Sequence, residues 1–154
     1  MAADPPDVTS DLQPPALAAA GRFLHRRWVH CLAVSAIVLL PCFWQRRIQA
    51  GDLASHVYNA WLAQLIERGE APGLWIARQW NNVLFDLALH ALGNSFGLAV
   101  AENLTVSAVV LVFFWGAFAL ASAAARRAAW LVAPCLAMVA YGWTFQMGFF
   151  NYYL

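Results

Sequence analysis

Four stretches of the chain contain no Asp, Glu, Lys or Arg: residues 28–45, 87–101, 103–125 and 128–154. About 18 or more apolar residues are enough to cross the hydrocarbon core of a bilayer as a helix. Two of the four stretches exceed that length, and residues 28–45 reach it. Of the 154 residues, 62% are hydrophobic and 11% are charged, which is more apolar material than a soluble domain of this size can bury. The sequence predicts an integral membrane protein and excludes a soluble enzyme, a nucleic-acid-binding domain and a disordered regulator.

The fold class expected from these stretches is all-α and polytopic. We predict about three transmembrane helices, over about residues 28–45, 101–124 and 129–148. Arginines near the ends of spans mark the cytoplasmic side of a membrane. Three arginines precede the first span and two separate the last two spans. This pattern places the N-terminus in the cytoplasm and residues 46–100 on the opposite side, although the arginine pair at 46–47 does not fit it.

The remaining segments are a tail and a long loop. The Pro-rich residues 1–21 are expected to form a disordered cytoplasmic tail. The loop is expected to hold two juxtamembrane amphipathic helices, at about residues 53–68 and 83–95. An alternative makes residues 83–99 a fourth span. Because the uncharged residues 128–154 end the chain without a polar tail, we expect the sequence to be the N-terminal part of a longer protein.

The first loop helix is expected to have a polar face next to an apolar stripe. The polar positions, spaced i, i+3, i+4 and i+7, are Asp52, Ser55, His56 and Asn59. One interpretation of this face is structural, because Asp is a favoured N-cap residue and the others would face water. The other interpretation is that Asp52 and His56, one helical turn apart, form a chemically active pair.

The second loop helix has a polar row of its own, at i, i+4 and i+8. It consists of Asn82, Asp86 and His90 among apolar neighbours. Ionisable groups near a membrane are costly, and they are often functional or paired with each other. A mutual hydrogen bond between Asp86 and His90 is the structural alternative. Glu102, at the start of the second span, is expected to be an interfacial charge.

The order of these features resembles the N-terminal module of the GT-C superfamily of membrane glycosyltransferases, which includes protein O-mannosyltransferases and bacterial aminoarabinose transferases. The first span is followed directly by Gly51-Asp52-Leu53-Ala54-Ser55-His56, then by a Gly-rich break, a half-apolar helix closing on Phe96-Gly97, and a span ending in paired arginines. The chain departs from the family pattern in three places. Leu53 replaces a second acidic residue, residues 79–82 replace a Pro-Pro pair, and Glu102 replaces an arginine.

The resemblance implies transfer of a sugar from a polyprenyl-phosphate carrier to an extracytoplasmic acceptor. Asp52 would then be the general base, and His56 would orient the acceptor or tune Asp52. Residues expected to bind substrate are Asn59, Arg78, Asn82, Asp86 and His90. An arginine among residues 46, 47 and 78 would neutralise the leaving phosphate.

The same resemblance sets the expected partners and location. The partners are the lipid bilayer and the lipid-linked sugar, and no nucleic acid is expected. The location is a bacterial inner membrane with the active loop in the periplasm. No cofactor or metal is indicated, although a divalent metal is possible. The alternative function is a non-catalytic multi-span membrane subunit or a truncated transporter.

Overall fold

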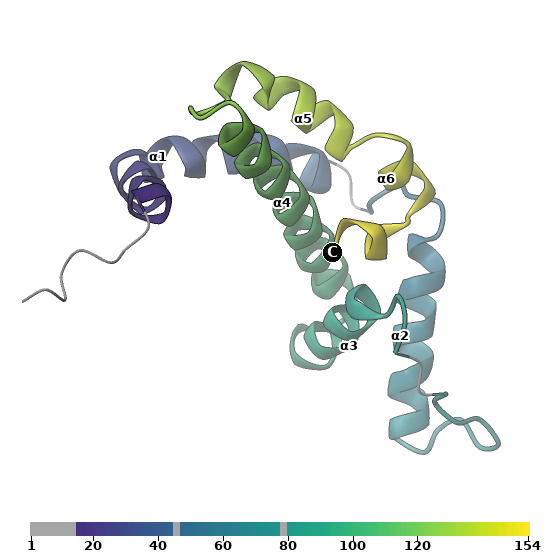
Figure 1. Ribbon diagram of the computed structural model, residues 1–154. Helices are drawn as coiled ribbons and strands as arrows, with labels where there is room; N and C mark the ends of the chain where they lie inside the picture. Colours follow the sequence, from purple (N-terminus) through teal and green to yellow (C-terminus); the bar gives the residue numbers. More distant parts are fainter. Residues whose placement is uncertain (1–14, 45–46, 78–79) are drawn as a thin grey trace, which may run out of the picture. The chain divides into compact units, whose positions relative to one another are not determined.

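The computed structural model describes residues 15–44, 47–77 and 80–154, with side chains from residue 28 onward. No strand is present in this part of the chain, and the all-α fold class is confirmed. The α-helices are α1 (Pro15–Trp44), α2 (Leu53–Glu67), α3 (Leu84–Phe96), α4 (Leu98–Ala124), α5 (Ala133–Ala140) and α6 (Trp143–Met147), and two short 3₁₀ helices are η2 (Trp130–Val132) and η3 (Phe150–Tyr153) (Figure 1).

The chain divides within α1 into two compact units, residues 1–37 and 38–154. In the first unit, α1 begins at Pro15, because proline suits the first position of a helix and an alanine-rich segment follows. Residues 15–21, which the composition assigned to the tail, are therefore helical. Residues 1–14 lie outside the described part.

Helix α4 is the only helix in the described residues that is long and apolar enough to cross a membrane. Its 27 residues extend over about 40 Å, against about 30 Å for a bilayer's hydrocarbon core. The span expected at residues 101–124 lies within this helix. The span expected at residues 28–45 falls on the C-terminal part of α1, whose apolar residues Trp28–Trp44 are helical.

The third span, expected at residues 129–148, does not exist as one helix. The segment is divided into η2, α5 and α6. Pro134 lies in the first turn of α5, where its missing N–H costs nothing, and Gly142 separates α5 from α6. With 8 residues, α5 extends over only about 12 Å.

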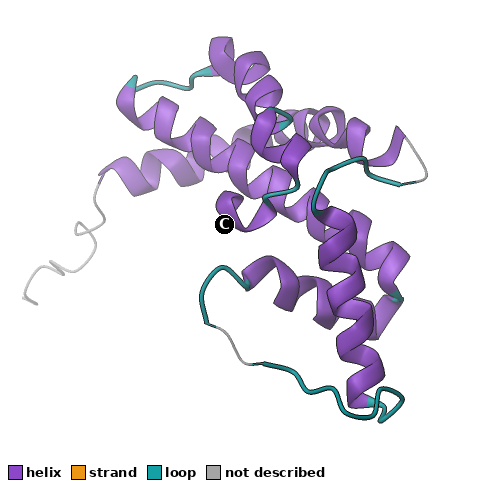
Figure 2. Cartoon of the chain, turned by 90° about the vertical axis from the view of Figure 1, so that its right-hand side faces the viewer, coloured by secondary structure: helices purple, strands orange, loops and turns teal. Residues whose placement is uncertain are grey.

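Helix α3 contacts α4, which follows it in the chain, and also α2. Figure 2 shows the described chain as helices joined by loops. Helix α3 ends at Phe96 and is capped by Gly97, whose φ of 82° is costly for other residues. Helix α4 begins at the residue after Gly97. The 13 residues of α3 extend over about 20 Å. This helix is too short to cross a bilayer, so the structure does not favour the alternative of a span over residues 83–99.

The C-terminal segment returns to the start of α2. The N–H groups of Gly51 and Asp52 donate to the carbonyl oxygens of Gln146 and Met147, at 2.8 and 3.0 Å. Gly148 makes this approach possible, because its φ is +77° and a Cβ there would lie 2.5 Å from the backbone nitrogen of Asp52. The segment from α6 to η3 is thereby fixed beside the loop helices.

We predict that Gly148→Ala destabilises the protein more than Gly69→Ala. Both glycines have a positive φ, but a Cβ at Gly69 would meet nothing within 4 Å. The left-handed conformation alone costs about 1–2 kcal/mol for alanine, and the clash with Asp52 adds to that at residue 148 only. Thermal unfolding followed by circular dichroism measures the difference, and equal losses in the two variants would contradict the close approach.

Candidate functional site

His56 lies between two carboxylates. Its Nδ1 is 2.6 Å from Oδ1 of Asp86 on α3, and its Nε2 is 3.6 Å from Oδ2 of Asp52, one turn earlier. The imidazole side chain is 15% exposed, and its ring packs edge-on against Phe85, with centroids 5.2 Å apart. The interpretation of His56 as part of a water-facing surface is therefore wrong.

Asp86 is held from a distant part of the chain as well. The side-chain amide of Asn151 donates to Oδ2 of Asp86 at 3.2 Å. The amide oxygen of Asn151 accepts the backbone N–H of Phe85 at 2.8 Å. This N–H belongs to the first turn of α3, where backbone donors have no partner within the helix. The N-cap residue, Val83, has no polar side chain that could accept a hydrogen bond from it. Asn151 therefore caps α3 and orients the carboxylate of Asp86.

These contacts shift the pKa values of the central pair in opposite directions. The hydrogen bond to Asp86 raises the pKa of His56 above its ordinary 6.5, burial opposes the rise, and the charges of Asp86 and Asp52 add to it. Burial acts to raise the pKa of Asp86, but the hydrogen bond and charge of His56 and the hydrogen bond from Asn151 outweigh it, so that pKa lies below 3.8. Both shifts favour an imidazolium–carboxylate pair.

Asp52 is the most exposed member of this network. It occupies the N-cap position of α2, but its side chain makes no capping hydrogen bond. The predicted capping role is thus limited to its backbone, whose carbonyl accepts the N–H groups of Ser55 and His56. Its side chain is 47% exposed, so this carboxylate can meet a molecule from outside.

The other predicted binding residues are not gathered at this network. Asn59 is exposed on α2, and Arg78 lies outside the described residues. Asn82 precedes α3 with a φ of 57° and lines a small hollow of about 350 Å³. His90 lies 3.0 Å from Oε1 of Glu67, so the expected Asp86–His90 pair is wrong, because each residue is paired with α2 instead.

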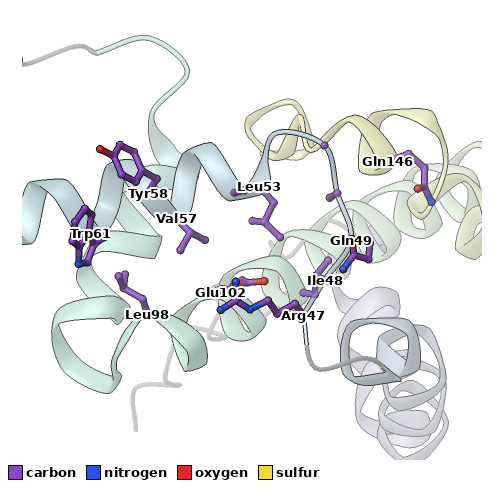
Figure 3. A pocket seen from close by; sticks show the side chains of 13 residues that line it. Arg47, Ile48, Gln49, Leu53, Val57, Tyr58, Trp61, Leu98, Glu102 and Gln146 are labelled. Atoms are coloured by element: carbon purple, nitrogen blue, oxygen red, sulfur yellow. The ribbon is translucent and has the colours of Figure 1, made fainter.

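A larger groove of about 840 Å³ opens on another side of α2 (Figure 3). Its lining residues come from the loop before α2, from α2, and from the ends of α4 and α6: Arg47, Ile48, Gln49, Ala50, Gly51, Leu53, Ala54, Val57, Tyr58, Trp61, Leu98, Glu102 and Gln146. At 100° per residue, the groove positions on α2 point away from the face that carries Asp52 and His56. The groove and the network are therefore separate features of one helix.

Asn151 is the residue that sequence reasoning missed. It lies 65 residues from its partner Asp86, just after the segment expected to span at residues 129–148. The available signal was an amide side chain within an uncharged aromatic segment, Gly-Phe-Phe-Asn-Tyr-Tyr-Leu. An amide placed among apolar side chains needs hydrogen-bond partners. No group of three or more His, Cys, Asp or Glu side chains that could hold a metal occurs in the described residues.

Comparison with known proteins assigns neither a family nor a function to the chain. No protein family, curated protein or solved structure matches the chain. Functional inference therefore depends on the geometry above and on the resemblance in motif order.

The stability that the His56–Asp86 pair contributes should depend on pH. Because the pKa of His56 is raised in the folded state, its contribution is complete below pH 6.5 and is lost as pH rises through the raised value. Because the pKa of Asp86 is lowered, its contribution is complete above pH 3.8 and is lost as pH falls through the lowered value.

We predict that the melting temperature lost in His56→Gln is largest between pH 3.8 and 6.5 and shrinks in alkaline solution. Melting temperatures of the detergent-solubilised protein from about pH 4 to about pH 9 measure this effect. His30→Gln, at an exposed position on α1, controls for the loss of a histidine. A deficit in His56→Gln that stays constant with pH would show that the ring contributes by packing alone.

Asn151→Asp should be destabilising by about 2 kcal/mol. The new carboxylate keeps an acceptor for the N–H of Phe85, but it replaces the donor to Asp86 with a like charge at the same distance. Thermal unfolding measures the loss, and Asn59→Asp, an exposed change of the same chemistry, is the matched control. A loss no greater than that of the control would mean that Asn151 does not hold Asp86.

Proposed function

We propose that the chain is the N-terminal part of a polytopic membrane glycosyltransferase similar to the GT-C superfamily. In this proposal a sugar moves from a polyprenyl-phosphate carrier to an extracytoplasmic acceptor, and Asp52 is the general base. The membrane is a bacterial inner membrane, with the N-terminus in the cytoplasm and the loop of α2 and α3 in the periplasm.

The observation that carries the proposal is the position of Asp52. Its half-exposed carboxylate stands at the start of α2, 3.6 Å from a histidine that a second carboxylate anchors. In the reaction, the acceptor's hydroxyl oxygen bonds to the anomeric carbon, the bond from that carbon to the phosphate oxygen breaks, and polyprenyl phosphate leaves. Asp52 takes the acceptor's proton as the new bond forms. His56, held by Asp86, then stabilises the position and charge of Asp52.

Exposed apolar side chains support a location in lipid. Only 39% of the most apolar window of α4 is buried. Leu120 within α4, and Leu131 and Met138 after it, are 73%, 89% and 76% exposed. Large apolar surfaces of this kind mark contact with a membrane or with further protein, as expected for one part of a larger bundle of spans.

We predict that Asp52→Asn lowers sugar transfer by about 10²- to 10⁴-fold, the usual contribution of a general base. The measurement is transfer of labelled sugar from polyprenyl-phosphate monosaccharides in membrane vesicles that contain the full-length protein. Ser55→Ala, an exposed change one turn away, is the control and should retain activity. Undiminished transfer by Asp52→Asn would remove Asp52 from the mechanism.

A non-catalytic membrane subunit is the second candidate, and one observation favours it. Asp86, His56 and Asn151 satisfy one another within the described residues, as a purely structural network would. In that case Asp52→Ala changes assembly with a partner in the membrane, measured by native electrophoresis. No polyprenyl-phosphate sugar is then consumed by the wild-type protein.

A further inference from the structure

The groove beside α2 carries two opposite charges that have no partner in the described part of the chain. Arg47 and Glu102 both line it (Figure 3). Among the described residues, neither side chain forms an ion pair or a side-chain hydrogen bond. A cation and an anion lining one hollow without pairing form a matched site for a ligand that carries both charges.

The rest of the lining is suited to lipid. Leu53, Val57 and Leu98 supply an apolar floor. Tyr58 and Trp61 stand at its edge with ring centroids 5.5 Å apart and are 56% and 42% exposed. Aromatic side chains of this kind gather where a bilayer meets water.

The position of Glu102 indicates at what level of a bilayer the groove would lie. It lies just over one turn from the N-terminal end of α4, which is the helix of membrane-spanning length. If α4 crosses a bilayer, the first turns of this helix lie at the level of the lipid headgroups, because α4 is about 10 Å longer than the hydrocarbon core. Arg47 and Glu102 then lie at the same depth in the bilayer as the charged groups of the phospholipid headgroups.

We propose that this groove binds one phospholipid with a phosphoethanolamine headgroup. Arg47 pairs with its phosphate and Glu102 accepts hydrogen bonds from its ammonium group. The acyl chains begin against Val57 and Leu98 and continue through the open side of the groove into the bilayer. This site is on a different face of α2 from Asp52, and it does not depend on the proposed sugar transfer.

The pair of charges distinguishes this lipid from other occupants. A polyprenyl phosphate has only negative charge, which satisfies Arg47 but is repelled by Glu102. Phosphatidylglycerol also lacks a cation for Glu102. Phosphatidylcholine has one, but its quaternary nitrogen has no N–H to donate to a carboxylate. Phosphatidylethanolamine alone among these four satisfies both side chains by hydrogen-bonded ion pairs.

Native mass spectrometry of the detergent-solubilised full-length protein tests the proposal, with phosphatidylethanolamine, phosphatidylcholine, phosphatidylglycerol and polyprenyl phosphate added at equal concentration. The wild-type protein should retain phosphatidylethanolamine about tenfold better than the other three, as one charged hydrogen-bonded pair allows. Equal retention of all four, preference for polyprenyl phosphate, or retention of none would overturn it.

Two variants give separate outcomes. Glu102→Gln should remove the preference for phosphatidylethanolamine and leave the retention of phosphatidylglycerol unreduced, because only the ammonium loses its partner. Arg47→Gln should weaken all of the phosphate-bearing lipids by about the same factor. Circular dichroism shows whether each variant is folded.

The matched control is Glu70→Gln, an exposed glutamate outside the groove that lies 3.7 Å from Arg68. It should bind lipid like the wild-type protein. The same loss of preference in Glu70→Gln and Glu102→Gln would assign the effect to net charge and overturn the site. Sugar transfer is a separate readout, so failure of the Asp52 experiment leaves this result unaffected.

Discussion

The side chain of Asn151 sets the geometry around which the loop helices assemble. One amide closes the open backbone end of α3 at Phe85 and, with its other end, holds the carboxylate of Asp86. Asp86 in turn fixes His56 on α2. A donor or acceptor left unpaired in such a half-buried place costs about 1–3 kcal/mol. Helix α2 sets the spacing of Asp52 and His56, and the orientation of the His56 ring depends, through Asp86, on a residue at the far end of the described chain.

Aromatic packing keeps Asn151 where its hydrogen bonds require it. Phe150 is fully buried and stacks on Phe85 with centroids 4.9 Å apart, while Phe145 meets it edge-on at 5.4 Å. Full burial of one such side chain contributes about 1.5–3 kcal/mol. Apolar burial thus brings the C-terminal segment to α3, and the polar contacts select one orientation of it. The uncharged aromatic end of the sequence serves the loop helices rather than continuing a membrane span.

The sequence predicted those elements whose signal is local. The periodic apolar stripe located α2, and the charge-free stretch after Glu102 located most of α4. The sequence-based prediction of a span at residues 129–148 was wrong, because hydropathy gives the same weight to an apolar residue in any backbone conformation. Pro134 begins a new helix there and Gly142 separates α5 from α6. Spacing also paired Asp86 with His90, its neighbour at i+4. Their actual partners lie on α2, and no spacing within one helix can identify a partner on another.

The apolar stripe of α2 has two roles that its periodicity alone does not separate. Leu53 is buried against protein, whereas Trp61 is 42% exposed along the groove. The helix thus presents lipid-compatible side chains on one face while Asp52 and His56 point from the other. Such a division would allow a short helix at a membrane surface to hold a carboxylate in water. A charged group and a bilayer can be neighbours at low cost only where the helix between them is amphipathic, and α2 meets that requirement.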